Sequence, residues 1–172
     1  TQDQEMIRAT AEAFLADASP STAVRQAMAT VDGFDATTWR RVGEELGWCA
    51  TTIPEDFGGL GLTIVEQVIL MEQMGRRLFC SPYFATACLA ATALLQVGTP
   101  AARQRYLPAI ASGTLTATLA FGECGLDGEA GTVTATARPS AGGFCLSGRF
   151  RHVPDGASAQ LLLLPGRVAG ST

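Results

Sequence analysis

Side chains capable of catalysis are sparse in this sequence. His152 is the single histidine, and no Gly-x-Ser-x-Gly motif accompanies it, so a serine–histidine triad has little support. All 12 basic residues are arginine, which excludes Schiff-base chemistry and a phosphate-loop lysine. Glu55 and Glu123 lie in loop-like stretches, where a carboxylate is more commonly solvated than catalytic. The residues alone therefore identify no catalytic base.

The cysteines do not form a metal-binding pattern. Their count is odd, their spacing is wide and no Cys-x-x-Cys pair occurs, so we expect no metal site. This usage predicts reduced, mostly buried thiols in a cytoplasmic protein. The five are Cys49, Cys80, Cys88, Cys124 and Cys145.

The composition predicts a folded protein and argues against nucleic-acid-binding and membrane-spanning proteins. The 172 residues are 47% hydrophobic and 16% charged, which is enough apolar material for a real core. The net charge is −4 and no basic run occurs, which argues against nucleic acid and an anionic membrane surface as partners. The stretch 84–95 is too short to span a bilayer, and the first eight residues do not form a signal peptide.

One stretch, Ile53–Leu62, has a highly specified backbone. Gly58, Gly59 and Gly61 predict positive φ angles or a very close approach of other atoms. Pro54 fixes its own φ and biases the residue before it toward an extended form. The stretch does not follow a strand, so it is not a phosphate-binding loop. It predicts a sharp turn between two helices.

Apolar periodicity predicts helices over 3–18, 21–31, 35–46, 63–78, 82–97 and 100–112. Ser19-Pro20-Ser21 ends the first helix and is expected to cap the second, and Pro108 is expected to kink or shorten the last. Helix 82–97 carries no charge, so it is buried on nearly all sides or lines an apolar cavity. Helix 63–78 has a wide apolar face that predicts burial between two layers: Ile64, Val68, Met71, Gly75 and Leu78, widened by Val65, Ile69 and Met74.

After Gly113 the pattern changes to strands and glycine-rich turns. Alternating or β-branched runs predict strands near 115–121, 132–138, 144–146 and 160–164. The fold class is therefore α+β. We expect an all-α helical domain over 1–113 and an incomplete, β-barrel-like domain over 114–172.

Three stretches then carry a family resemblance. The first is WRRVGEELGW at 39–48, leading into IPEDFGGLG at 53–61. The second is VGTPAARQRYLPAIASG at 97–113. The third is weaker and joins LAFGE at 119–123 to LSGR at 146–149 and DGASA at 155–159. In their order and spacing they resemble the acyl-CoA dehydrogenase family.

The resemblance implies a helical N-terminal domain, a middle β domain and a C-terminal four-helix bundle, the last absent from this chain. It implies FAD as cofactor, an acyl-CoA thioester as substrate and electron-transfer flavoprotein as electron acceptor. Such proteins remove an α-proton with a carboxylate and transfer the β-hydrogen to the flavin, in fatty acid or steroid side-chain β-oxidation and other lipid metabolism. The base usually comes from the bundle, so the catalytic residue of this chain stays unknown. A homo- or hetero-oligomer is expected.

This sequence departs from the family where flavin is held. The matching cofactor-binding positions are Phe121, Gly122 and Glu123, then His152, Val153 and Pro154. Gly122 replaces the usual threonine, and Pro154 replaces a serine or threonine and has no N–H to donate. Together these departures predict a subunit that binds flavin poorly.

We therefore expect the flavin-poor partner in a heteromeric complex, a heterotetramer acting on bulky steroid-type thioesters. Two alternatives stay open: an ordinary homo-oligomeric FAD-dependent acyl-CoA dehydrogenase, and a non-catalytic structural or binding subunit. The resemblance also places the two helices after the glycine loop beside the acyl chain. The expected substrate contacts are Met71, Met74, Tyr83, Thr86 and Ala87.

Overall fold

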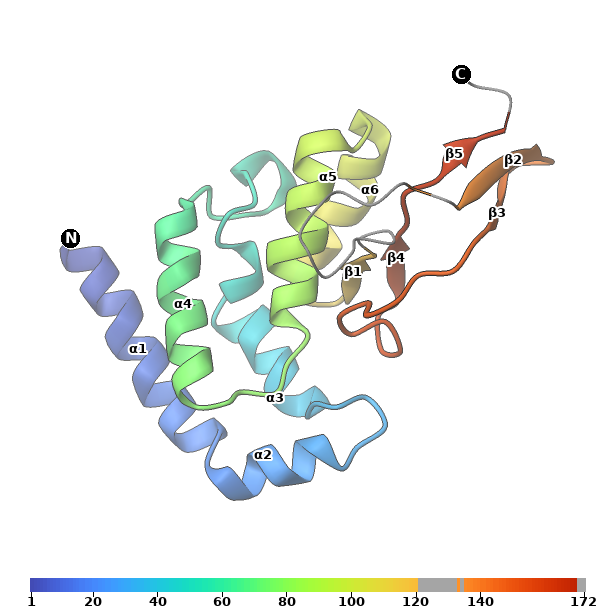
Figure 1. The fold of residues 1–172 in the computed structure, drawn as a ribbon. Helices are drawn as coiled ribbons and strands as arrows, with labels where there is room; N and C mark the ends of the chain where they lie inside the picture. The colour runs from blue at the N-terminus through green and yellow to red at the C-terminus, as the bar shows by residue number, and fades with distance from the viewer. Residues whose placement is uncertain (121–132, 134, 170–172) are drawn as a thin grey trace.

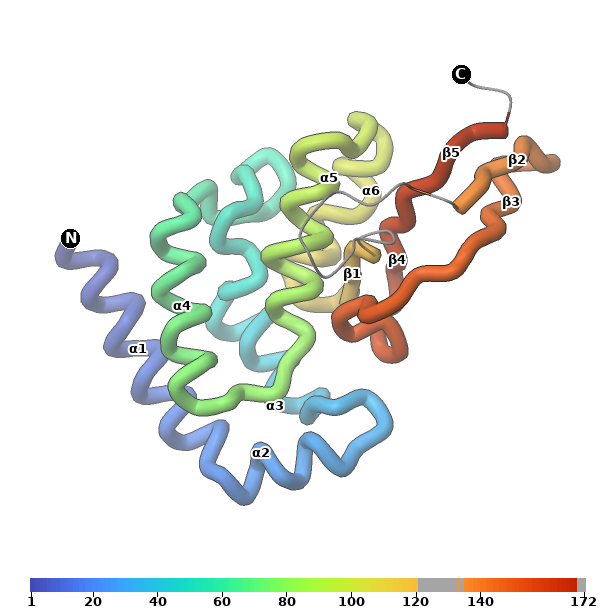
Figure 2. Tube along the Cα trace, viewed as in Figure 1, coloured from blue at the N-terminus to red at the C-terminus, as the bar shows by residue number. Residues whose placement is uncertain are grey.

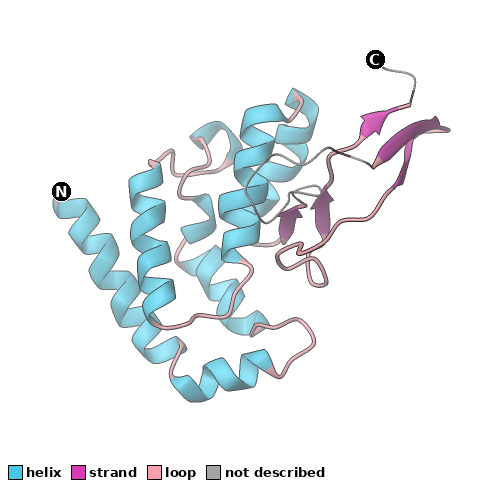
Figure 3. Ribbon diagram, in the orientation of Figure 1, coloured by secondary structure: helices cyan, strands magenta, loops and turns pink. Residues whose placement is uncertain are grey.

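The computed structural model describes residues 1–120, 133 and 135–169, and it consists of a helical part followed by short strands (Figures 1 and 3). The helices are α1 (Gln2–Ala18), α2 (Ser21–Met28), α3 (Ala36–Arg40), α4 (Ile64–Arg76), α5 (Ala91–Val97) and α6 (Pro100–Ala111). Two wider π-helical segments, Arg41–Glu45 and Phe84–Ala90, continue α3 and lead into α5. Short 3-10 turns occupy Trp48–Ala50 and Glu55–Phe57.

The strands are β1 (Ala117–Leu119), β2 (Thr136–Ser140), β3 (Gly143–Ser147), β4 (Leu161–Leu163) and β5 (Arg167–Val168). β1 pairs with β4 in parallel, and Figure 2 shows the chain returning beside β1 to form that pair. β2 lies between β3, which is antiparallel to it, and β5, which is parallel. The predicted α+β class and the order of elements are confirmed. β5 was not predicted, because two residues are too few to show a periodic pattern.

Two apolar clusters form the core. One joins α1, the segment 39–49, α4 and the start of helix 84–97, with Phe14 edge-on to Trp48 at 5.3 Å between ring centroids. The second joins α5 and α6 to Ile53 from the glycine loop and Ala117 from β1. The second cluster therefore extends from the helical part into the first strand.

The glycine-rich loop has the predicted conformation. Gly58 and Gly61 have φ values of 77° and 60°, and a Cβ on Gly59 would overlap the carbonyl group of Ile53. The loop folds back on the segment before it, since the N–H of Leu60 donates to the carbonyl of Ala50 and that of Leu62 to Thr51, both at 2.9 Å. All three glycines are therefore needed for backbone reasons.

The predicted buried face of helix 63–78 is wrong in part: Ile69 and Met74 are buried, but most of the stripe is not. Ile64, Val68 and Leu78 are 62%, 57% and 73% exposed. The inward face combines Leu70 with Glu66 and Gln67, two polar side chains that have hydrogen-bond partners and so can be buried at little cost. Gln67 donates to the carbonyl of Ala87 at 3.3 Å, and the Glu66 carboxylate accepts from Gln4 and Thr63.

Two smaller helix predictions also differ. α2 ends at Met28 rather than 31, and its N-cap is Pro20 with no side-chain hydrogen bond, so the expected cap at 19–21 does not form. The Ser19 hydroxyl donates instead to the carbonyl of Arg77. α6 runs to Ala111 with Pro108 inside it, so the proline does not shorten the helix. Burial of Leu107 and Ile110 holds that turn in place.

The described cysteines are free thiols, as predicted, but the prediction that they are mostly buried is wrong, since Cys80 and Cys88 are only half-buried. Cys49 is buried, and burial raises its pKa to about 12. Cys145 is exposed, and Cys124 lies outside the described residues. Among the helices that the structure describes, none combines the length and apolar character needed to cross a membrane.

Candidate functional site

The described part of the predicted flavin region is built on β1 and β4. Thr116, just before β1, joins the two strands: its carbonyl accepts from the N–H of Leu161 at 3.0 Å, and its hydroxyl donates to the carbonyl of Ser158 at 3.1 Å. Its own N–H donates to the Gln160 side chain at 3.0 Å. These bonds fix the turn that precedes β4.

That turn, residues 152–159, contains unusual backbone. His152 and Asp155 have φ values of 53° and 50°, in the left-handed region that non-glycine residues adopt uncommonly. The carbonyl of Asp155 accepts from the N–H groups of Ser158 and Ala159, which closes the turn. The buried Thr118 hydroxyl of β1 donates to the carbonyl of Pro154 at 2.7 Å. The turn is therefore tied to the strand beneath it.

The carboxyl group of Asp155 is half-buried in this turn, and desolvation raises its pKa above the ordinary value. A raised carboxyl pKa makes ionisation unfavourable in the folded state. Stability from this group is fully present below the unfolded-state pKa of about 4 and is lost as pH rises through the folded-state value.

We expect Asp155→Asn to be more stable than the parent at pH 7, with the difference disappearing near pH 3. Asparagine tolerates the same left-handed backbone, so only the charge changes. Chemical denaturation of both proteins at the two pH values measures this. A variant less stable at pH 7 would mean that the carboxylate has a stabilising partner.

The structure tests the predicted flavin contacts only in part. Phe121, Gly122 and Glu123 lie outside the described residues. Of the second group, the His152 side chain is exposed and Val153 is half-buried. Pro154 has no N–H, and its carbonyl already accepts from Thr118. A flavin ring accepts hydrogen bonds along its polar edge, and the backbone of residue 154 supplies no donor for one.

The predicted substrate contacts lie mainly in the helical core. Tyr83, Thr86 and Ala87 are at most 1% exposed, and Met74 is 5% exposed. The Tyr83 hydroxyl donates to the carbonyl of Trp48 at 3.3 Å. Met71 is half-buried at the edge of the first cluster. A role in substrate binding stays a prediction for all five.

Thr86 has a definite structural role. Its hydroxyl donates to the carbonyl of Ala117 and accepts from the N–H of the same residue, both at 3.1 Å. Helix 84–97 is thereby bonded to β1. Sequence reasoning missed the roles of Thr116 and Thr118, although their alternation with Ala117 indicates that one face of the strand could be polar.

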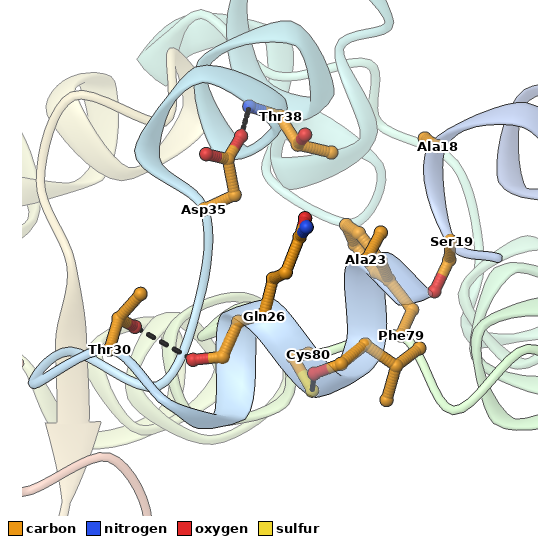
Figure 4. A pocket seen from close by; sticks show the side chains of 11 residues that line it. Ala18, Ser19, Ala23, Gln26, Thr30, Asp35, Thr38, Phe79 and Cys80 are labelled. Carbon is orange, nitrogen blue, oxygen red and sulfur yellow. Dashed lines mark hydrogen bonds between the residues drawn. The ribbon is translucent and has the colours of Figure 1, made fainter. Parts of the chain in front are cut away.

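A separate cavity of about 290 Å³ lies between α2, the start of α3 and residues 79–80 (Figure 4). Gln26 extends into it, while the Asp35 carboxylate accepts from the N–H of Thr38 at 2.7 Å as the cap of α3. This hydrogen bond lowers the pKa of Asp35. Within the described ranges, no residue predicted to bind cofactor or substrate lines this cavity.

Comparisons with known proteins agree with the fold. Residues 1–114 match the model of the acyl-CoA dehydrogenase N-terminal domain. The acyl-CoA dehydrogenase IpdE2 of Mycolicibacterium smegmatis is 34% identical over 121 residues, which cover 70% of this chain and 37% of that protein.

Among solved structures, a variant of the Tcur3481-Tcur3483 steroid ACAD superposes with a TM-score of 0.85 at 27% identity, over 98% of this chain and 45% of that one. The ChsE4-ChsE5 complex from Mycobacterium tuberculosis gives 0.84 at 25% identity, over 98% and 45%. The chain thus spans less than half the length of these relatives. Because the family model matches residues 1–114 of the 172, this chain belongs to the acyl-CoA dehydrogenase family.

Proposed function

We propose that this chain is part of a subunit of a heteromeric acyl-CoA dehydrogenase, one that relies on a related subunit for most contacts to FAD. The complex would remove one α- and one β-hydrogen from an acyl-CoA thioester and pass the electrons to electron-transfer flavoprotein. The likeness to the two-component ChsE4-ChsE5 and Tcur3481-Tcur3483 proteins supports the heteromeric arrangement. The steroid ACAD relative supports a bulky, steroid-type thioester as substrate.

The observation that carries the flavin-poor assignment is the Thr118–Pro154 hydrogen bond. It fixes Pro154 against β1 through its carbonyl, and proline, which replaces a donor in the family pattern, has no N–H. The backbone of residue 154 therefore offers a flavin edge no hydrogen-bond donor.

In this proposal, side chains of the helical part form one side of the pocket that holds the acyl group. The set is Met71, Met74, Tyr83, Thr86 and Ala87, and Met71 is the member best placed to contact a ligand because it is only half-buried. Methionine suits such a pocket, since its flexible thioether adapts to irregular apolar groups.

The decisive experiment measures flavin content by absorbance. The product of the complete gene is purified alone and after co-expression with a related subunit, and dehydrogenation of steroid and straight-chain CoA thioesters is assayed for both. We expect flavin far below one per chain for the protein alone, and flavin with activity for the complex. One flavin per chain in the isolated protein would indicate an ordinary homo-oligomeric enzyme. A flavin-loaded complex with no turnover of any thioester would indicate a non-catalytic binding subunit.

A further inference from the structure

A shallow surface pocket of about 600 Å³ lies where the C-terminal end of α4 meets the junction of α1 and α2. These helix ends lie side by side at the lower left of Figure 1. The pocket lining combines cationic and apolar side chains, with no acidic residue among those that the structure describes. We call it the Arg–Leu surface. It consists of Ser19, Pro20, Ser21, Val24, Arg25, Met28, Arg76, Arg77 and Leu78.

The apolar part of this surface is held out in solvent. Met28 and Leu78 are 70% and 73% exposed. Leu78 also has a φ of 49°, because it occupies the left-handed position directly after α4. The N–H of Phe79 donates to the carbonyl of Met74 at 3.0 Å, and the N–H of Leu78 donates to Gly75 at 3.2 Å. These two bonds define a Schellman motif, in which glycine is the favoured residue at this position.

A leucine here is disfavoured twice. Its Cβ is strained in the left-handed region, and its side chain is left in water instead of the core. Retaining a strained, exposed apolar side chain points to a use for it outside the fold.

The cationic part is also available for a partner. Arg25 and Arg77 make no side-chain hydrogen bond or ion pair with any residue that the structure describes. Arg76 pairs with Glu72 at 3.3 Å and is 60% exposed. Guanidinium groups bind carboxylates in a bidentate manner, so Arg25 and Arg77 beside an apolar centre match acidic residues that flank a hydrophobic side chain.

We propose that the Arg–Leu surface docks an acidic protein segment with an apolar anchor, the anchor packing on Leu78 and Met28 while its carboxylates pair with Arg25 and Arg77. An anionic membrane fits less well. An anionic bilayer interacts with the summed charge of a wide protein face, and the net charge of this chain is −4. A short acidic segment interacts mainly with the arginines that it contacts, because salt screens more distant charges.

The test uses the product of the complete gene and a fluorescein-labelled peptide in which two leucines alternate with glutamates. Fluorescence anisotropy measures binding to the parent, to Leu78→Gly and to Arg25→Gln/Arg77→Gln. Peptides with lysine in place of glutamate, or serine in place of leucine, test charge and anchor separately. Arg40→Gln and Val31→Ala are matched exposed controls; Val31 is 99% exposed.

We expect the acidic leucine peptide to bind the parent and both controls, and its affinity to fall about tenfold or more in the two test variants. Leu78→Gly should meanwhile raise the midpoint of thermal unfolding, which separates a binding role from a structural one. Absence of binding to the parent, equal binding of the lysine peptide, or unchanged affinity in Leu78→Gly would each overturn the proposal. So would binding to phosphatidylserine vesicles without binding to the peptide. None of these results depends on flavin content.

Discussion

Replacing Gly59 by alanine is expected to destabilise the fold by about 3 kcal/mol or more. The added Cβ would overlap the carbonyl group and the Cβ of Ile53, a residue with 0% exposure in the second core cluster. Backbone cannot move aside as a flexible side chain can, and the loop is fixed by its bonds to Ala50 and Thr51. Equilibrium denaturation of the purified variant measures the loss.

Gly75→Ala is the matched control. Gly75 lies inside α4 and a Cβ there would meet nothing within 4 Å, so alanine should stabilise the protein by about 0.5 to 1 kcal/mol through its better helix propensity. The same chemical change should thus have opposite signs at the two positions. A Gly59→Ala protein as stable as the parent would show that the loop can adopt another backbone path.

Thr86→Val is expected to cost about 2 to 4 kcal/mol, although the two side chains have nearly the same shape. The valine cannot replace the hydroxyl that serves both the N–H and the carbonyl of Ala117, so two buried backbone groups lose their partner. Thr86 itself is 0% exposed, so water cannot substitute without opening the structure. Thermal or chemical unfolding gives the difference directly.

Two companion variants make this result specific. Thr86→Ser retains the hydroxyl and loses one methyl group, so it should cost only about 1 kcal/mol. Thr92→Val, at an exposed position of α5, should change stability by less than about 0.5 kcal/mol. If valine and serine at position 86 proved equally stable, the hydroxyl would not be the group that joins helix to strand.

Local chemistry made much of the fold predictable. Positive φ angles or close backbone approach were predicted at Gly58, Gly59 and Gly61 because only glycine tolerates them easily, and the loop has this conformation. Helix positions followed from apolar spacing, as in α1, which was predicted over 3–18 and runs from Gln2 to Ala18. Such features depend on a few neighbouring residues, which is why a sequence can specify them.

Partner-dependent features were not predictable in the same way. The inward face of α4 is set by Gln67 reaching the carbonyl of Ala87, a contact across 20 positions that periodicity cannot reveal. The hydroxyl of Thr86 bonds to a strand 31 positions away, a role that the sequence did not predict, while its contact with substrate stays a prediction. The order and spacing of the motifs identified the family. The hydrogen-bond partners of the threonine hydroxyls could be assigned only from the tertiary structure.

The second core cluster has a consequence for how the helices and the first strand pair unfold. Ala117 of β1 and Leu161 of β4 pack with Leu94, Leu107 and Ile110 from the helices, so the change from helix to strand at residue 113 does not interrupt the apolar core. The change in secondary structure at residue 113 therefore does not divide the chain into two parts that unfold independently. We expect β1 and β4 to separate from each other only when α5 and α6 also unfold. The contact between these strands and helices is therefore not expected to act as a hinge.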